Sequence, residues 1–249
     1  MNPGTESIVC VVSWNLLAQK FVSNRLEWST RRACILDTLS GVHADVILLQ
    51  EAGMDTFEAD FQELVHPIDG LYDYTRYQSK KKRRHRQCCV ILWRRATFSL
   101  CSSSTASHRA THCVLMHGAT GRRLAIANLH LKAGLVSNEE VRVKELEDAL
   151  LCCEESDCLL LGGDLNDDLK PAGRLYPILH ETVRLEGIDS AQPSCFINGT
   201  YMAFDHLLTH SGGGGGGGTL TRLHCDTPYT NTSPPMNPRY PIQSFPLII

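Results

Sequence analysis

The chain has 249 residues, of which 43% are apolar and 20% are charged, and its formal net charge is −3. These values are typical of a globular protein and exclude collagen-like, coiled-coil and wholly disordered chains. No stretch approaches the roughly 20 consecutive apolar residues of a membrane-spanning helix, so we expect no membrane insertion. The chain shows no internal repeat and no clear linker, and we predict a single domain over residues 1–249.

Short apolar runs alternate with helical patterns along the chain, which predicts an α/β fold. The expected strands are, in chain order, Ile8–Ser13, Asp45–Gln50, Cys88–Trp93, Val114–His117, Arg123–Leu131, Cys158–Leu161, Met202–Leu208 and Phe245–Ile249. The expected helices are Thr30–Leu39, one that starts at Asp55 with Glu58 three residues later, and one from a capping box at Ser137 and Glu140 to about Cys153. Seven glycines at 212–218 predict a loop between two strands.

Positive charge is concentrated in one short run. Residues 80–86 hold six of the 24 Lys and Arg residues and no acidic residue, whereas the rest of the chain carries 18 basic and 27 acidic side chains. A basic loop on an acidic body indicates a local contact with a polyanion. We expect residues 80–86 to contact a nucleic-acid backbone; the alternative is a solvated loop between two strands.

The cysteines indicate a reducing compartment. Their number, eleven, is odd, and no C-x-x-C spacing occurs, so they fit neither a disulfide framework nor a zinc ribbon. The first residues carry no Lys or Arg before Lys20, which fits neither a secretory nor a mitochondrial signal. We expect a cytoplasmic protein, with the nucleus as the alternative because of the basic run.

Polar side chains follow several expected strands at the point where each strand ends. Asn15 follows one apolar run, Glu51 follows a second, and Asp164 and Asn166 follow a third that ends in two glycines. Enzymes with α/β folds gather their ligands at strand ends. Carboxylate and carboxamide oxygens, with no Cys or His among them, suit Mg²⁺ or Mn²⁺. The sequence therefore predicts a site for Mg²⁺, or for Mn²⁺, at these strand ends.

Five short motifs stand in a fixed order over nearly the whole chain: SWNLLAQ at 13–19, LLQE at 48–51, NLHLKA at 128–133, GGDLN at 162–166 and FDHLL at 204–208. In this order they resemble the motifs of the endonuclease/exonuclease/phosphatase superfamily, and most closely those of the nocturnin and Angel-type deadenylase branch. The resemblance implies a four-layer α/β sandwich, in which two packed mixed β-sheets are flanked by helices. It also implies metal-dependent hydrolysis of a phosphate ester.

The same resemblance implies a role for each polar residue of these motifs. Glu51 would hold the metal, and Asn15 would assist it and contact the substrate. Asp164 would orient or deprotonate the attacking water. Asn166 would contact the phosphate or the metal-bound water.

Three further residues would act around the phosphate. The resemblance implies that His130 faces the phosphate and that Lys132 adds a cation beside it. Asp205 matches the aspartate that, in the family, orients a catalytic histidine near the end of the chain. The neighbouring His206 is expected to point away from Asp205, because successive strand residues face opposite sides.

The end of the chain departs from the family pattern. Where the family has Ser-Asp-His before its last strand, alignment of the flanking residues places Ile242, Gln243 and Ser244, none of which titrates near pH 7. The usual catalytic acid is therefore missing. His210 and His224 are the candidates to replace it.

Two functions stay open at this point. The first is a Mg²⁺-dependent phosphodiesterase or 3′–5′ exonuclease, similar to a deadenylase, in which water attacks the phosphate of single-stranded RNA or of a nucleotide in line. The second is a catalytically impaired member that binds RNA, a nucleotide or a protein partner. Intact metal ligands favour the first function. The missing histidine motivates the second, because loss of one general acid slows a reaction by roughly 10²–10⁴.

Overall fold

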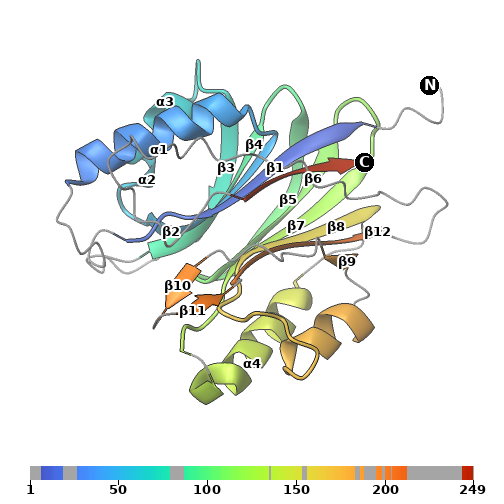
Figure 1. The fold of residues 1–249 in the computed structure, drawn as a ribbon. Coiled ribbons are helices and arrows are strands. Elements are labelled where there is room, and N and C mark those ends of the chain that lie inside the picture. The colour runs from blue at the N-terminus through green and yellow to red at the C-terminus, as the bar shows by residue number, and fades with distance from the viewer. Residues whose placement is uncertain are drawn as a thin grey trace.

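Two mixed β-sheets pack face to face, and helices cover the outer face of each sheet (Figure 1). This computed structural model confirms the four-layer α/β sandwich that the motifs predict. It describes residues 7–18, 27–78, 87–134, 136–152, 156–182, 186–187, 195–197, 200–202, 204–211 and 243–248. The predicted basic loop at 80–86 and glycine loop at 212–218, together with His224 and Ile242, lie outside the described residues.

The first sheet has five strands in the order β13-β1-β2-β4-β3. Their bounds are Ile8–Asn15 for β1, Val46–Gly53 for β2, Tyr72–Arg76 for β3, Gln87–Arg94 for β4 and Gln243–Ile248 for β13. Strands β1 and β2 are parallel, and the other pairs are antiparallel. The parallel pair needs a crossover connection, and helix α1, Trp28–Val42, lies in that connection.

The second sheet has six strands in the order β5-β6-β7-β8-β12-β9. Their bounds are Phe98–Ser107 for β5, Ala110–His117 for β6, Arg123–His130 for β7, Cys158–Asp164 for β8, Asp205–Ser211 for β12 and Glu186–Gly187 for β9. Only β7 and β8 pair in parallel, and helix α4, Glu139–Leu150, connects them. Strands β10, Cys195–Ile197, and β11, Thr200–Met202, form a separate two-stranded ladder.

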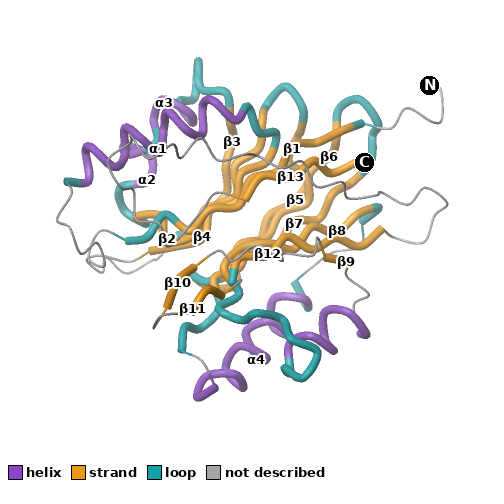
Figure 2. Tube along the Cα trace, viewed as in Figure 1, coloured by secondary structure: helices purple, strands orange, loops and turns teal. Residues whose placement is uncertain are grey.

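Three buried apolar clusters hold the sandwich together. Figure 2 shows the helices on the outer sides of the two sheets. Between the sheets, apolar side chains such as Val46, Ile91 and Leu115 are fully buried. Short helices α2, Phe57–Asp60, and α3, Gln62–Val65, pack with α1 on the first sheet. Helix α4 and a π-helical turn at Pro177–Thr182 lie against the second sheet. None of the helices in the described part of the chain is long and apolar enough to cross a bilayer.

The structure corrects two predicted helix starts. The N-cap of α2 is Thr56, not Asp55, and α4 begins at Glu139, after a 3₁₀ turn that contains Ser137. Neither N-cap side chain makes a capping hydrogen bond. The predicted capping box at Ser137 and Glu140 is therefore wrong, because Ser137 lies in the 3₁₀ turn that precedes the α-helix.

The buried His112 on β6 makes stability depend on pH. It is 3% exposed, and burial lowers the pKa of its imidazole because desolvation penalises the charged form. A histidine whose pKa is lowered on folding takes up its proton in the unfolded chain first. The associated stability is present above the unfolded pKa of about 6.5 and is lost as the pH falls below it.

We predict that His112→Asn weakens this acid dependence. Wild-type unfolding free energy should fall below pH 6.5 with a contribution from this residue of at most about 1.4 kcal/mol per pH unit. Urea unfolding between pH 7.5 and pH 5.5 measures the slope, with the exposed His43→Asn variant as the control. Parallel pH profiles for wild type and His112→Asn would contradict the prediction.

Candidate functional site

Most of the predicted site residues meet at one end of the sandwich. Asn15 ends β1 and pairs with Gln50 of β2, next to Glu51. In the second sheet, Asp164 ends β8 and pairs with His130 on one side and with Asp205 on the other. The carboxyl ends of four strands and the start of β12 therefore supply the site, as the strand-end rule predicts.

Asn15 connects carboxylates from the two sheets. It is 2% exposed, and its Nδ2 donates hydrogen bonds to Glu51 Oε1 at 3.2 Å and to Asp164 Oδ2 at 2.8 Å. Its Oδ1 accepts a hydrogen bond from the Leu17 N–H at 2.9 Å. Two carboxylates thus converge on one amide nitrogen, and each comes from a different sheet.

The backbone around Glu51 is held in unusual conformations. Glu51 has φ +58° and Leu17 has φ +52°, a region that residues other than glycine rarely adopt. The Ala18 N–H donates to Glu51 Oε2 at 2.7 Å, and the Arg31 guanidinium on α1 donates to the carbonyl oxygens of Leu16 and Leu17 at 2.5 and 2.9 Å. These contacts fix the Glu51 carboxylate and the segment after β1 against each other. Strain of this kind gathers at functional sites.

Two glycines explain how β8 delivers Asp164. Gly163 has φ +124°, and a Cβ there would overlap the Leu129 carbonyl oxygen. At Gly162 a Cβ would overlap the Leu207 side chain on β12. Gly163 therefore requires glycine, whereas at Gly162 flexible side-chain ends would have to shift. The pair lets β8 lie close to its neighbours.

Asn166 lies beside Asp164 and has φ +50°. Its backbone N–H donates to Asp164 Oδ1 at 2.9 Å, and its side-chain Nδ2 donates to the Leu131 carbonyl oxygen at 3.0 Å. The Asp164 carboxylate is therefore hydrogen-bonded on both oxygens, by Asn15 and by Asn166. The neighbouring His206 contacts the backbone carbonyl of Asp167 through Nε2 at 2.7 Å.

His130 and Lys132 differ in how closely the structure brings them to the carboxylates. His130 Nε2 lies 3.9 Å from Glu51 Oε1 and 3.9 Å from Asp164 Oδ2. Lys132 is exposed, and its backbone N–H donates to Glu145 Oε2 at 2.7 Å. The imidazole thus belongs to the site in this structure, whereas the lysine lies at its edge.

The donor set fits a hard divalent cation. Glu51, Asp164 and Asn15 offer carboxylate and carboxamide oxygens, and the two convergent carboxylates concentrate negative charge that such an ion would balance. Within the described residues, no three Asp, Glu, His or Cys side chains form a ready metal cluster. The ion would complete its coordination mainly with water, as Mg²⁺ usually does, because Asn15 Oδ1 already accepts the Leu17 N–H.

The structure also locates the altered end of the chain. Gln243 and Ser244 start β13 and pair with Ser13 and Val12, so this segment returns beside the end of β1 that carries the site. His210 pairs with Leu159, five residues along β12 from Asp205, which is roughly 17 Å at 3.3 Å per residue. His210 therefore does not fill the place of the missing histidine.

Sequence reasoning missed a buried polar link between the sheets. Gln50 Nε2 on β2 donates to Asn128 Oδ1 on β7 at 2.8 Å, and Asn128 Nδ2 donates to the carbonyl oxygens of Leu49 and Val90 at 3.0 and 2.8 Å. Both carboxamides are 0% exposed. Gln50 directly precedes Glu51, and Asn128 stands two residues before His130, each within one of the five sequence motifs. That position was the sequence signal that could have identified them.

We predict that Asn128→Ala lowers the free energy of unfolding by about 2–4 kcal/mol, because it leaves several buried polar groups unsatisfied. Asn138→Ala is the matched control, since it removes a similar hydrogen bond to the Ala133 carbonyl at an exposed position. Urea unfolding measures both variants. Equal losses of unfolding free energy in the two variants would contradict the prediction, because the buried link would then stabilise the protein no more than the hydrogen bond of Asn138.

Comparisons with known proteins relate the chain to a family and to several solved structures. The model of the Endonuclease/Exonuclease/phosphatase family matches residues 12–227, and a search of curated proteins finds no match. The human nocturnin catalytic domain with bound sulfate has a TM-score of 0.70 at 19% identity, over 96% of this chain and 94% of that one. ANGEL2, a 2′,3′-cyclic phosphatase in complex with adenosine-2′,3′-vanadate, has a TM-score of 0.75 at 15% identity, over 98% of this chain and 96% of that one. D. rerio TDP2 with a single-strand DNA product has a TM-score of 0.65 at 15% identity, over 97% of this chain and 98% of that one.

These structural similarities, all below 20% identity, show a shared fold. Nocturnin and ANGEL2 belong to the branch that the five motifs resemble. The family match covers most of the chain, so the protein belongs to the Endonuclease/Exonuclease/phosphatase family.

Proposed function

We propose that the protein is a Mg²⁺-dependent phosphodiesterase, acting as a single domain over residues 1–249 on single-stranded RNA or a nucleotide. One observation carries this proposal: the Asn15 amide joins the carboxylates of Glu51 and Asp164, from two different sheets, at the end of the sandwich where His130 also lies. The two convergent carboxylates concentrate negative charge at this point, which a divalent cation would balance.

The division of labour follows from these contacts. Glu51 and Asn15 would hold Mg²⁺, or Mn²⁺, which when bound polarises the phosphate and neutralises developing charge. Asp164 accepts hydrogen bonds on both oxygens, so its carboxylate has a fixed orientation from which it aligns a water or takes its proton. In-line displacement at phosphorus needs mostly positioning and charge neutralisation, which this arrangement supplies.

The phosphate would lie between the carboxylates and the rim of the site. His130 would face it, Asn166 would contact it from the loop after β8, and Lys132 would add positive charge from the exposed side. Asp205 would take part from β12, directly across from Asp164. With Ser244 in place of the usual histidine, protonation of the leaving group falls to water or to another group, which predicts a slow enzyme.

The similar structures support a nucleotide substrate. The nocturnin structure holds a sulfate anion, ANGEL2 holds adenosine-2′,3′-vanadate, and TDP2 holds a single-strand DNA product. By this analogy the chain would be a deadenylase-like 3′–5′ exoribonuclease in the cytoplasm or nucleus. The free thiols in the described part of the chain fit a reducing compartment.

A second candidate is a catalytically impaired protein that binds RNA, a nucleotide or a protein partner at the same site. The replacement of the closing histidine, with Gln243 and Ser244 at the start of β13, favours it. The metal-binding side chains argue against it, since a pure binding protein has no need to keep two carboxylates together.

Hydrolysis of a labelled single-stranded RNA with a 3′ adenosine tail tests the proposal. We expect Mg²⁺-dependent cleavage by the wild type and a loss of at least about 10² in rate for Asp164→Ala, because that variant removes the group that aligns water. Asp69→Ala, whose side chain is 81% exposed, is the control and should cleave at the wild-type rate. Binding of the RNA with no cleavage by any of the three proteins would favour the second candidate.

A further inference from the structure

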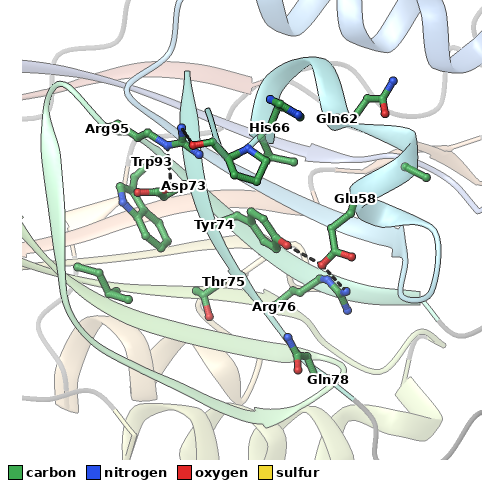
Figure 3. A pocket seen from close by; sticks show the side chains of 14 residues that line it. Glu58, Gln62, His66, Asp73, Tyr74, Thr75, Arg76, Gln78, Trp93 and Arg95 are labelled. Atoms are coloured by element: carbon green, nitrogen blue, oxygen red, sulfur yellow. Dashed lines mark hydrogen bonds and ion pairs between the residues drawn. The ribbon is translucent and has the colours of Figure 1, made fainter. Parts of the chain in front are cut away.

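A groove of about 870 Å³ lies at the outer edge of β3, the last strand of the five-stranded sheet (Figure 3). Residues of β3 form its base, α2 and α3 form one wall, and Leu100 of β5 contributes from the other sheet. From Asp73 to Gln78 the groove follows the chain for roughly 17 Å at 3.3 Å per residue. That length accommodates several stacked nucleotides at about 3.4 Å each.

The charged residues of the groove are arranged in pairs. Arg76 donates to Glu58 Oε1 at 2.9 Å, the Tyr74 hydroxyl donates to the same oxygen at 2.6 Å, and Arg95 donates to Asp73 Oδ1 at 2.8 Å (Figure 3). Each carboxylate is thus occupied by a neighbouring guanidinium. The groove itself is close to neutral, and the sequence continues one residue after Gln78 into the run at 80–86, which holds six cations.

The groove also contains hydrogen-bond donors without acceptors. Trp93 Nε1 and Arg76 Nε are buried and have no partner among the described residues. The Trp93 side chain is 2% exposed and packs in the apolar core between the sheets, so its donor lies beneath the surface of the groove. Gln62 and Gln78 add exposed amides at its rim. A ligand rich in acceptor oxygens would match these groups better than an apolar one.

Contacts connect this groove to the candidate active site. The Arg109 guanidinium donates to the His130 carbonyl oxygen at 3.1 Å. The adjacent His108 ring lies 6.5 Å from the Tyr77 ring, centroid to centroid, in an edge-to-face arrangement, and Tyr77 directly precedes Gln78. His108 is exposed, so the pair offers a ring face between the site and the groove. Bases of a single strand stack on such rings whatever their sequence.

We propose that the groove binds the part of a single-stranded polynucleotide substrate that lies away from the cleaved phosphate. The strand would pass from the carboxylates over His108 and Tyr77 and continue along β3. Phosphate and base oxygens would accept hydrogen bonds from the donors there. This inference rests on the proposed function for the identity of the substrate.

The test compares affinity for a long and a short strand. Fluorescence anisotropy without Mg²⁺, at low ionic strength, measures binding of a labelled oligoadenylate dodecamer and of a dinucleotide. The double variant Gln62→Glu, Gln78→Glu adds two negative charges to the rim with almost no change of shape. Lys144→Glu, on the exposed side of α4, changes the net charge by the same amount and is the control.

We expect the double variant to bind the dodecamer about tenfold more weakly, since each added charge repels nearby phosphates. Dinucleotide binding should be unchanged, and Lys144→Glu should bind both strands as the wild type does. Thermal unfolding checks that the variants fold. A dodecamer carrying 4-thiouridine should also cross-link to the peptide that contains Tyr77 and Gln78.

Two results would overturn the inference. One is an equal effect of the double variant and Lys144→Glu on dodecamer binding. The other is binding of an oligoglutamate peptide that depends on Gln62 and Gln78 while RNA binding does not, which would identify a groove for acidic peptides. Because the readout is binding, it is separate from the proposed function: absent hydrolysis with intact length-dependent binding would contradict only the latter.

Discussion

Buried hydrogen bonds donated by carboxamide side chains join the two sheets, and the candidate site depends on them. Asn15 reaches from β1 to Asp164 on β8, and Gln50 reaches from β2 to Asn128 on β7. A buried polar group is costly unless it finds its partner, so these hydrogen bonds favour one alignment of the two sheets. Apolar contacts such as those of Val46 hold the sheets together but do not define how they are aligned. The polar links do, and they bring the strand ends into one place.

The backbone near these links is strained in a consistent pattern. Leu17, Glu51 and Asn166 all have positive φ. Glu51 lies within β2, and Leu17 and Asn166 each come two residues after a strand that ends at the site. Such conformations persist only where surrounding contacts hold them. Here the contacts come from the Arg31 guanidinium and from the hydrogen bonds to Glu51 and Asp164. These contacts hold the Glu51 and Asp164 carboxylates in fixed positions, which fits catalysis by positioning.

The sequence predicted several strands and the polar residues at their ends, because buried strands such as β2, β4 and β8 are continuous apolar runs bounded by polar residues. The four layers were implied by the resemblance of the motifs to a known family. The sequence analysis missed the whole of β5, whose serine-rich segment carries few typical strand residues and pairs with β6 in the structure. It also missed the partners of Asn128, because a link between two sheets has no local signature. The motifs identified the polar residues of the site. Their contacts with residues far away in the sequence became visible only in the folded structure.

The central claim is that Glu51, assisted by Asn15, holds a divalent cation used for hydrolysis beside Asp164. A crystal of the wild-type protein soaked in Mn²⁺ tests it most directly, because Mn²⁺ prefers the same oxygen ligands as Mg²⁺ and gives an anomalous signal. The account predicts an anomalous peak within coordination distance of the Glu51 carboxylate and on the same side as Asp164. A site without a peak at saturating Mn²⁺, or a peak bound elsewhere on the molecule, would contradict it.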